Sequence, residues 1–282
     1  SSDVCSSDLM IKKMILTLIS ALTFILFSGL SYAEEYICKY PTLMRRVYEN
    51  GAVVYRLQFS IFDGSGSRVS NDVVKLVVLL GPDSTEIELS NPVFVKYLSL
   101  DGHFDCNDGQ WHYQEEFSTT TFYRVTVYET LTQGNYYLGI LSTDDTVIYE
   151  DYVYFNGPVD LPQISSKSFR GYEDDSGDFI FQWNPPNDTN FWNSMLDTTV
   201  SAYIIIYNDQ GWVGDLTVKL PTAVGMFMVP ERIMSLVKTK GNHLRVGLHL
   251  RTNDNDNRYY SNYIPINQLK PELKNVVVIP LN

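Results

Sequence analysis

The stretch Phe179–Tyr207, FIFQWNPPNDTNFWNSMLDTTVSAYIIIY, decides the fold that we expect for this chain. Its first part alternates, so Phe179, Phe181 and Trp183 would lie on one face of a strand. The Pro-Pro pair that follows cannot donate hydrogen bonds to a sheet, so strand pairing is expected to end there. The run Ala202–Tyr207 is β-branched and aromatic, which predicts a second strand. Such strands need another sheet over their aromatic face, as in a β-sandwich.

The segment 163–268 carries further alternation of this kind. Residues that would share strand faces, besides those above, are Ile164, Tyr203, Ile205, Tyr207, Leu244, Val246, Leu248 and the run Tyr259–Asn262. This pattern resembles a fibronectin type III domain. The sequence departs from that family at Leu244, where the penultimate strand usually begins with Tyr, so the tyrosine corner is absent or built otherwise. The crossover Pro230–Val237 also predicts a short helix, followed by Gly241.

The segment 34–157 shows short strand signals separated by turns about ten residues apart, a spacing typical of an all-β sandwich. Its closing part, from Leu131 through Gly134 and Tyr136 to Phe155, resembles the final hairpin of bacterial immunoglobulin-like domains. The fold class that we expect is therefore all-β, with two immunoglobulin-like or fibronectin type III-like sandwiches in tandem. The expected parts are 1–33 (leader), 34–157 (first sandwich), 158–162 (linker), 163–268 (second sandwich) and 269–282 (C-terminal strand or tail).

The N-terminal region predicts export. Ser1–Leu9 resembles translated sequencing-adapter read-through and is set aside. Met10–Ala33 has a basic start, an apolar centre and small residues before the expected cleavage after Ala33, which is the pattern of a secretory signal. The alternative is a membrane anchor, but the apolar run is shorter than the roughly 20 residues that span a bilayer. We expect a mature chain without a membrane span, in the periplasm or outside a bacterial cell.

The charge of the chain bears on its partners. The net charge is −12, so nucleic acid and anionic lipid would be repelled. The expected partner is an unidentified protein or glycan. The sequence has no His-x-x-x-His pair and no Glu-containing metalloprotease motif. His243 and His249 could share a strand face, but His103, His112, His243 and His249 are all interpreted as ordinary strand residues.

Two cysteines, Cys38 and Cys106, remain after the expected cleavage. In an exported protein an even number of cysteines usually pairs, so we expect a disulfide between them. The alternative, free thiols or a shared metal, lacks the close ligand spacing of a zinc site.

An acidic, glycine-bearing stretch is a candidate calcium site. Asp101, Asp105, Asn107 and Asp108 supply the oxygen ligands that Ca²⁺ prefers, although their spacing is not that of an EF-hand. The turn Asp254–Asn257 is a similar, weaker candidate. Asp and Asn also dominate ordinary turns for local reasons.

Three tryptophans, Trp111, Trp192 and Trp212, fall in expected loops. Such rings stack on sugars or anchor protein contacts, and they also plug loops over a core. They are the candidate ligand-binding residues.

No catalytic motif stands out in the sequence, so we expect no enzyme. The leading hypothesis is a non-catalytic exported bacterial protein that acts as a binding or spacer module. The alternatives are a carbohydrate-binding module that uses the loop tryptophans and a hydrolase built on loops. A fold resemblance alone does not choose among them.

Overall fold

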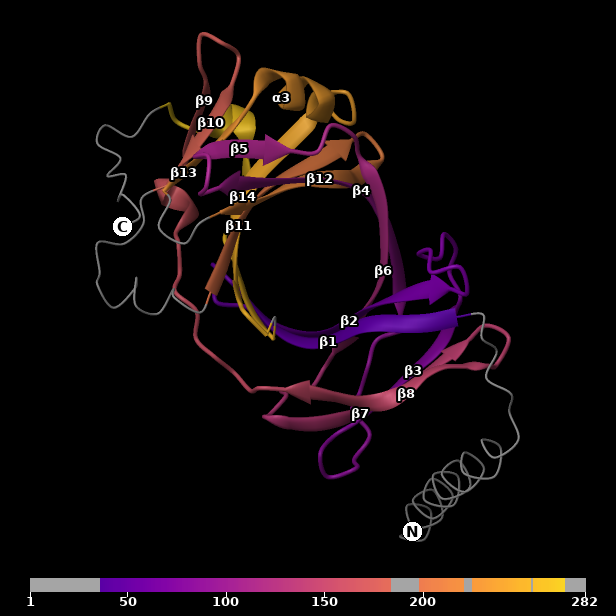
Figure 1. The fold of residues 1–282 in the computed structure, drawn as a ribbon. Helices are drawn as coiled ribbons and strands as arrows, with labels where there is room; N and C mark the ends of the chain where they lie inside the picture. Colours follow the sequence, from indigo (N-terminus) through magenta and orange to yellow (C-terminus); the bar gives the residue numbers. More distant parts are fainter. Residues whose placement is uncertain (1–35, 184–197, 221–224, 255, 272–282) are drawn as a thin grey trace, which may run out of the picture.

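The structure is a computed structural model, and it describes residues 36–183, 198–220, 225–254 and 256–271 (Figure 1). The expected signal peptide, the Pro-Pro corner, Trp192 and the expected C-terminal strand lie outside these residues. β-strand is the dominant regular structure of the described parts, as alternation and β-branched runs predict. The predicted short helix is confirmed as α3 (Glu231–Lys238).

The main sheet closes on itself. Its neighbouring strands are, in order around the ring, β11 (Thr198–Asn208), β12 (Gly211–Leu220), β4 (Val93–Asp105), β6 (Ser118–Val127), β2 (Val53–Asp63), β1 (Tyr36–Tyr48), β15 (Asn257–Tyr260) and β14 (His243–Thr252). Strand β14 also pairs with β11, which closes an eight-stranded barrel. Two short strands extend it: β5 (Gln110–Tyr113) pairs with β4, and β16 (Ile264–Pro265) pairs with β14.

Two small sheets lie outside the barrel. One has the order β13 (Met226–Val229), β10 (Phe179–Gln182), β9 (Arg170–Glu173), and the other β3 (Val74–Leu80), β7 (Gly134–Ser142), β8 (Val147–Phe155). Short 3₁₀ turns cover Ser166–Ser168 and Ile266–Gln268. Figure 1 shows the first sheet and α3 against one side of the barrel and the second sheet against the opposite side.

The expectation of two tandem sandwiches is wrong. Strands from the first half of the chain (β1, β2, β4, β6) and from the second half (β11, β12, β14, β15) form one closed sheet. Two parallel pairings join the halves: β12 pairs with β4 from Gly214 to Lys219, and β1 pairs with β15 from Arg45 to Tyr48. Parallel partners far apart in sequence leave no local turn signal, which explains why hydrophobic periodicity alone did not indicate them.

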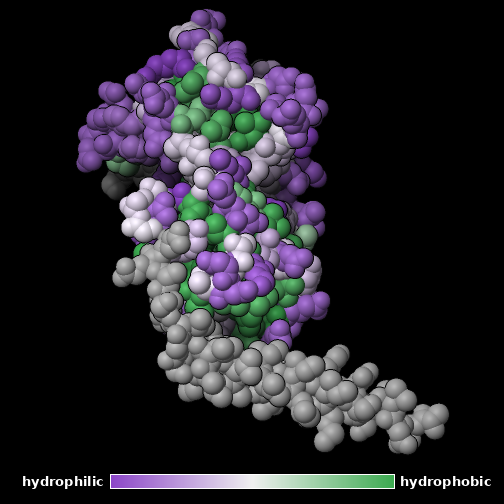
Figure 2. All heavy atoms as spheres, turned by 90° about the vertical axis from the view of Figure 1, so that its right-hand side faces the viewer, coloured by the Kyte–Doolittle hydropathy of each residue, from purple (hydrophilic) through white to green (hydrophobic). Residues whose placement is uncertain are grey.

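Each small sheet covers a separate hydrophobic core. The first core packs the outward faces of β11, β12 and β14 against β10, β13 and α3, with Phe181, Phe227 and Val237 fully buried. The second core packs the outward faces of β1, β2 and β6 against β3, β7 and β8, and Leu57 and Phe59 are among its buried residues. The outward faces of the barrel strands therefore supply one wall of each core. On the side of the molecule shown in Figure 2, hydrophobic surface is visible on both halves, with hydrophilic residues around it.

The other face of each barrel strand points toward the barrel axis, since side chains alternate between the two faces of a sheet. On β2 the outward Tyr55, Leu57 and Phe59 are buried, whereas the inward Arg56 and Gln58 are half-buried. The same alternation on β11 leaves Tyr203 half-buried between buried neighbours. Charged and aromatic side chains thus line the interior and remain partly accessible to water.

The expected disulfide is also wrong: within the described residues both cysteines are free. Cys38 is buried in the second core, where burial raises the pKa of its thiol to about 12. Cys106 is exposed in the turn between β4 and β5, a hairpin whose Trp111 packs on the first core. One thiol thus lies in the second core and the other in a hairpin next to the first core, an arrangement that sequence spacing does not indicate.

The parallel pairing of β12 with β4 can be tested at Gly214. A Cβ atom at this position would meet the Leu98 carbonyl oxygen at 2.2 Å. We expect Gly214→Ala to lower the free energy of unfolding by about 1–3 kcal/mol, as overpacking does. Gly139→Ala on β7 is the control, because its Cβ would find only ordinary contacts at 3.8 Å or more. If urea unfolding shows that both variants lose the same free energy of unfolding, the pairing of β12 with β4 is contradicted.

Candidate functional site

Five arginines form a belt inside the barrel. Arg124, Arg56, Arg46, Arg258 and Arg251 stand on the neighbouring strands β6, β2, β1, β15 and β14. In the sheet register Arg46 lies beside Arg258, and Arg258 lies opposite Arg251. Like charges placed side by side across strands destabilise a sheet. The belt is therefore a feature that folding alone does not favour.

Contacts at the centre of the belt are with neutral groups. Arg46 donates from Nη2 to the Gln58 amide oxygen at 3.1 Å, and its Nε lies 3.3 Å from the Met44 sulfur. The guanidinium of Arg46 also lies over the ring of Tyr260, 5.2 Å from its centroid. The buried Nε of Arg56 finds no acceptor among the described residues.

The electrostatics of Arg56 reflect these surroundings. Burial lowers the pKa of its guanidinium, and the positive charges of Arg46 and Arg124 lower it further, while Tyr48 and Tyr260 act in the opposite direction. No carboxylate is among these neighbours. The belt thus concentrates positive charge inside a chain whose net charge is −12.

An aromatic group adjoins the belt. The imidazole of His249 packs between Tyr203 and Tyr260, with centroids 3.9 Å and 4.0 Å away, and hydrogen-bonds the Tyr263 hydroxyl. Tyr48 stacks on Tyr260 at 5.3 Å. Burial, and then the charges of Arg258 and Arg46, hold the pKa of His249 well below its ordinary value, so the ring is neutral at pH 7.

The belt also lowers the pKa of Tyr260, where it favours the negatively charged form of the side chain. Burial acts to raise the pKa of its hydroxyl, but the charges of Arg46, Arg258 and Arg56 outweigh that effect and lower it. Arg258 hydrogen-bonds this hydroxyl. The belt therefore stabilises negative charge at the position where this phenol lies.

One carboxyl group is buried on the barrel wall away from the belt. Asp215 on β12 accepts a hydrogen bond from the Thr217 hydroxyl at 3.1 Å. Burial raises the pKa of Asp215 to about 7, and the negative charge of Asp101 adds to the effect. Tyr203 lies within reach of both Asp215 and Arg258. The interior thus has a basic belt and a separate carboxyl, with tyrosines between them.

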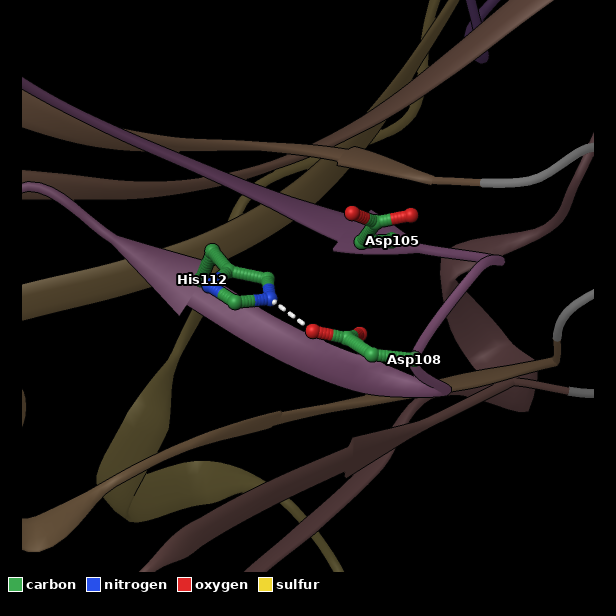
Figure 3. Close-up of side chains that lie close together, drawn as sticks. All are labelled: Asp105, Asp108 and His112. Atoms are coloured by element: carbon green, nitrogen blue, oxygen red, sulfur yellow. Dashed lines mark hydrogen bonds and ion pairs between the residues drawn. The ribbon is translucent and has the colours of Figure 1, made fainter.

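The predicted calcium ligands separate into two places. Figure 3 shows Asp105 and Asp108 beside His112 on the β4–β5 hairpin, and their ligand atoms lie within 4.8 Å of one another. Asp108 accepts a hydrogen bond from the His112 Nε2 at 2.8 Å. Asn107 donates its backbone and amide N–H groups to Asp105, each at 2.8 Å. Asp101 lies on β4 opposite Thr217 of β12, where its negative charge acts on Asp215.

This hairpin cluster differs from a calcium cage. Its ligand atoms would be two carboxylates and one imidazole nitrogen, and both Asp108 and His112 are exposed. Nitrogen ligands suit zinc or copper better than calcium, which takes six to eight oxygens. The neighbouring His103 ring stacks on His112 at 5.5 Å, so both residues have partners within the hairpin.

The tryptophans have different surroundings. Trp111 packs against the first core and contacts Phe104 at 4.9 Å, so its ring is a plug over the core. Trp212 is 40% exposed and stacks on Tyr97 at 4.9 Å, while its indole N–H donates to the Gly214 carbonyl. Trp192 lies outside the described residues.

Comparison with models of known protein families gives no match, and a search of curated proteins also gives none. Within the described residues no helix is long and apolar enough to span a membrane.

The belt could not be found from the sequence because its members are scattered over five strands. Each arginine occupies the polar position of an alternating strand, which reads as a solvent-facing residue. The available signal was that Arg46, Arg56, Arg124, Arg251 and Arg258 share this inward register in strands of a strongly acidic chain. That signal has meaning only once the closed strand order is known.

The buried carboxyl of Asp215 predicts a pH dependence of stability. The native state keeps its proton up to about pH 7, whereas the unfolded chain releases it near the ordinary pKa of 3.8. The native state then binds more protons in this interval, so this group lowers the free energy of unfolding as pH rises from about 4 to 7. We expect Asp215→Asn to flatten that slope in thermal melts and to raise the Tm at pH 8.

The exposed Asp175 provides the control for this experiment, and Asp175→Asn should follow the wild type at every pH. A slope that persists unchanged in Asp215→Asn would contradict the assignment.

The hairpin geometry also predicts the response to calcium. We expect millimolar Ca²⁺ to leave the Tm unchanged relative to EDTA, because a ligand that binds only the native state would raise it and the hairpin offers too few oxygens. Thermal melts of the wild type and of Asp105→Asn check this. A rise with Ca²⁺ that Asp105→Asn abolishes would contradict the prediction.

Proposed function

We propose that this protein is a non-catalytic, exported bacterial binding protein that holds a small anionic ligand inside its barrel. The observation that carries the proposal is the arginine belt on five neighbouring strands of a chain with net charge −12. The signal-like segment Met10–Ala33 supports export.

Charge is the first argument for an anion. Arg46, Arg56 and Arg124 act on one another as like charges, and burial makes that repulsion stronger than in water. A bound carboxylate, sulfate or phosphate would neutralise the repulsion and would supply acceptors for several guanidinium donors. The buried Nε of Arg56 has no acceptor among the described residues, so this guanidinium group is not fully paired by the protein itself.

Access is the second argument. Arg46, Arg56, Arg124 and Arg258 are half-buried, although their outward neighbours in the same strands are mostly buried in the two cores. Partial exposure inside a closed sheet means that water reaches these side chains, and a small ligand that replaced this water would meet the guanidinium groups. Eight-stranded barrels hold either side chains or one small ligand in their interior.

The aromatic group limits the type of ligand. His249, Tyr203 and Tyr260 are packed together beside the belt, and the imidazole is neutral. Rings of this kind pack against a flat or apolar body while their polar edges form hydrogen bonds. A small anion with an organic body fits this combination better than a nucleic acid or a lipid surface, which the acidic exterior repels.

Inorganic phosphate and citrate are suitable probes of the belt. We expect each to raise the Tm relative to potassium chloride at equal ionic strength, because only the native state assembles the belt. At 100 times Kd, binding adds about 2.7 kcal/mol to the free energy of unfolding. Citrate recovered unchanged after incubation would support a non-catalytic role.

Charge removal separates a binding role from a structural one. Arg56→Gln should abolish the rise with either anion and should leave the Tm in chloride unchanged or higher, since a repulsive charge is lost. Arg232→Gln is the control: Arg232 is exposed and pairs with Glu115 on the surface, so the response to anions should persist. A wild-type Tm that is equal in phosphate, citrate and chloride would contradict the proposal.

A further inference from the structure

Tyr152 projects from the outer face of β8, away from the core that this strand covers. Its neighbours Val153 and Phe155 are buried in the second core, whereas Tyr152 is 64% exposed and Tyr154 is 46% exposed. The exposed rings contribute nothing to that core. Strand β8 pairs only with β7 in its sheet, so it lies at a sheet edge.

Two depressions meet at Tyr152. The first, of about 340 Å³, is lined by Tyr152 together with Tyr137, Asn135, Ser84 and the turn Leu80–Pro82. The second, of about 310 Å³, is lined by Tyr152 together with Pro41, Thr42, Val153, Tyr154, Asn156, Asp254 and Asp256. One exposed ring therefore forms part of the wall of both, and a ligand longer than one depression would cross it.

Polar groups in the second depression are held in place by hydrogen bonds. Asn156 donates from its amide to Asp254 at 2.9 Å and to Asp256 at 3.1 Å, and its backbone N–H donates to Asp256 at 2.8 Å. Asp256 is buried, whereas Asp254 is exposed. Asp254 Oδ1 also accepts from the Thr252 hydroxyl and the Asp256 backbone N–H. A carboxylate has about four acceptor sites, so Oδ2 keeps one of them for a ligand hydroxyl.

The first depression offers uncharged groups. The Tyr137 ring meets that of Tyr152 edge to face at 5.8 Å, and its hydroxyl donates to Glu150, which fixes the position of the ring. Asn135 and Ser84 add an amide and a hydroxyl to the lining. This depression thus combines aromatic surface with neutral hydrogen-bonding groups.

We propose that these two depressions are adjoining subsites for a neutral oligosaccharide, with one sugar ring stacked on Tyr152. Sugars present an apolar C–H face that packs on an exposed aromatic ring and hydroxyl groups that bind amides and carboxylates. The acidic groups Asp254 and Glu150 would repel anionic ligands. This site is separate from the barrel interior and does not depend on the anion proposed there.

The test is a titration of the full chain with hexasaccharides of glucose and of N-acetylglucosamine, followed by NMR of the protein. We expect one of them to bind and Tyr152→Ala to weaken it about tenfold or more, the scale of a lost stacking contact. Tyr152→Phe keeps the ring and should retain binding. Tyr128→Ala is the matched control, because Tyr128 is 61% exposed and lines neither depression.

Three outcomes would overturn the proposal: no binding of either hexasaccharide, binding that Tyr152→Ala leaves unchanged, or equal loss in Tyr128→Ala. The phosphate-dependent rise in Tm, measured on the same variants, shows whether the barrel site is intact. Failure of one site is therefore distinguishable from failure of the other.

Discussion

The parallel pairings of β12 with β4 and of β1 with β15 join the two halves of the chain into one closed sheet. Without these two pairings each half of the chain would keep open sheet edges, which invite pairing with other chains. With them, eight strands close and share one interior. The close approach at Gly214, whose missing Cβ leaves room for the Leu98 carbonyl, shows how tightly the strands of one pairing are packed.

Closure also divides the side chains by function. The outward faces are used to bury two cores under separate sheets, so the chemistry of the inward faces is free of the demand to be apolar. That freedom allows Arg46 and Arg258 to stand side by side and His249 to pack between two tyrosines. The cores give the stability, and the interior carries the charge that we assign to binding.

Local sequence signals predicted local structure well. The alternation of Phe179 and Phe181 predicts β10, and Pro230 marks the start of α3. The sandwich fold and the Cys38–Cys106 disulfide failed because both depend on which distant strands become neighbours. Asp105 and Asp108 do come together, but His112 joins them and Asp101 does not, since strand register decides which side chains meet.

Anomalous diffraction from crystals soaked in selenate would show whether the arginine belt binds an anion, because selenate has the charge and shape of sulfate and its selenium atom can be located directly. We expect a selenium peak inside the barrel, within hydrogen-bonding distance of the Arg56 and Arg46 guanidinium groups. Selenate bound only at the outer surface, with water alone beside these arginines, would contradict it.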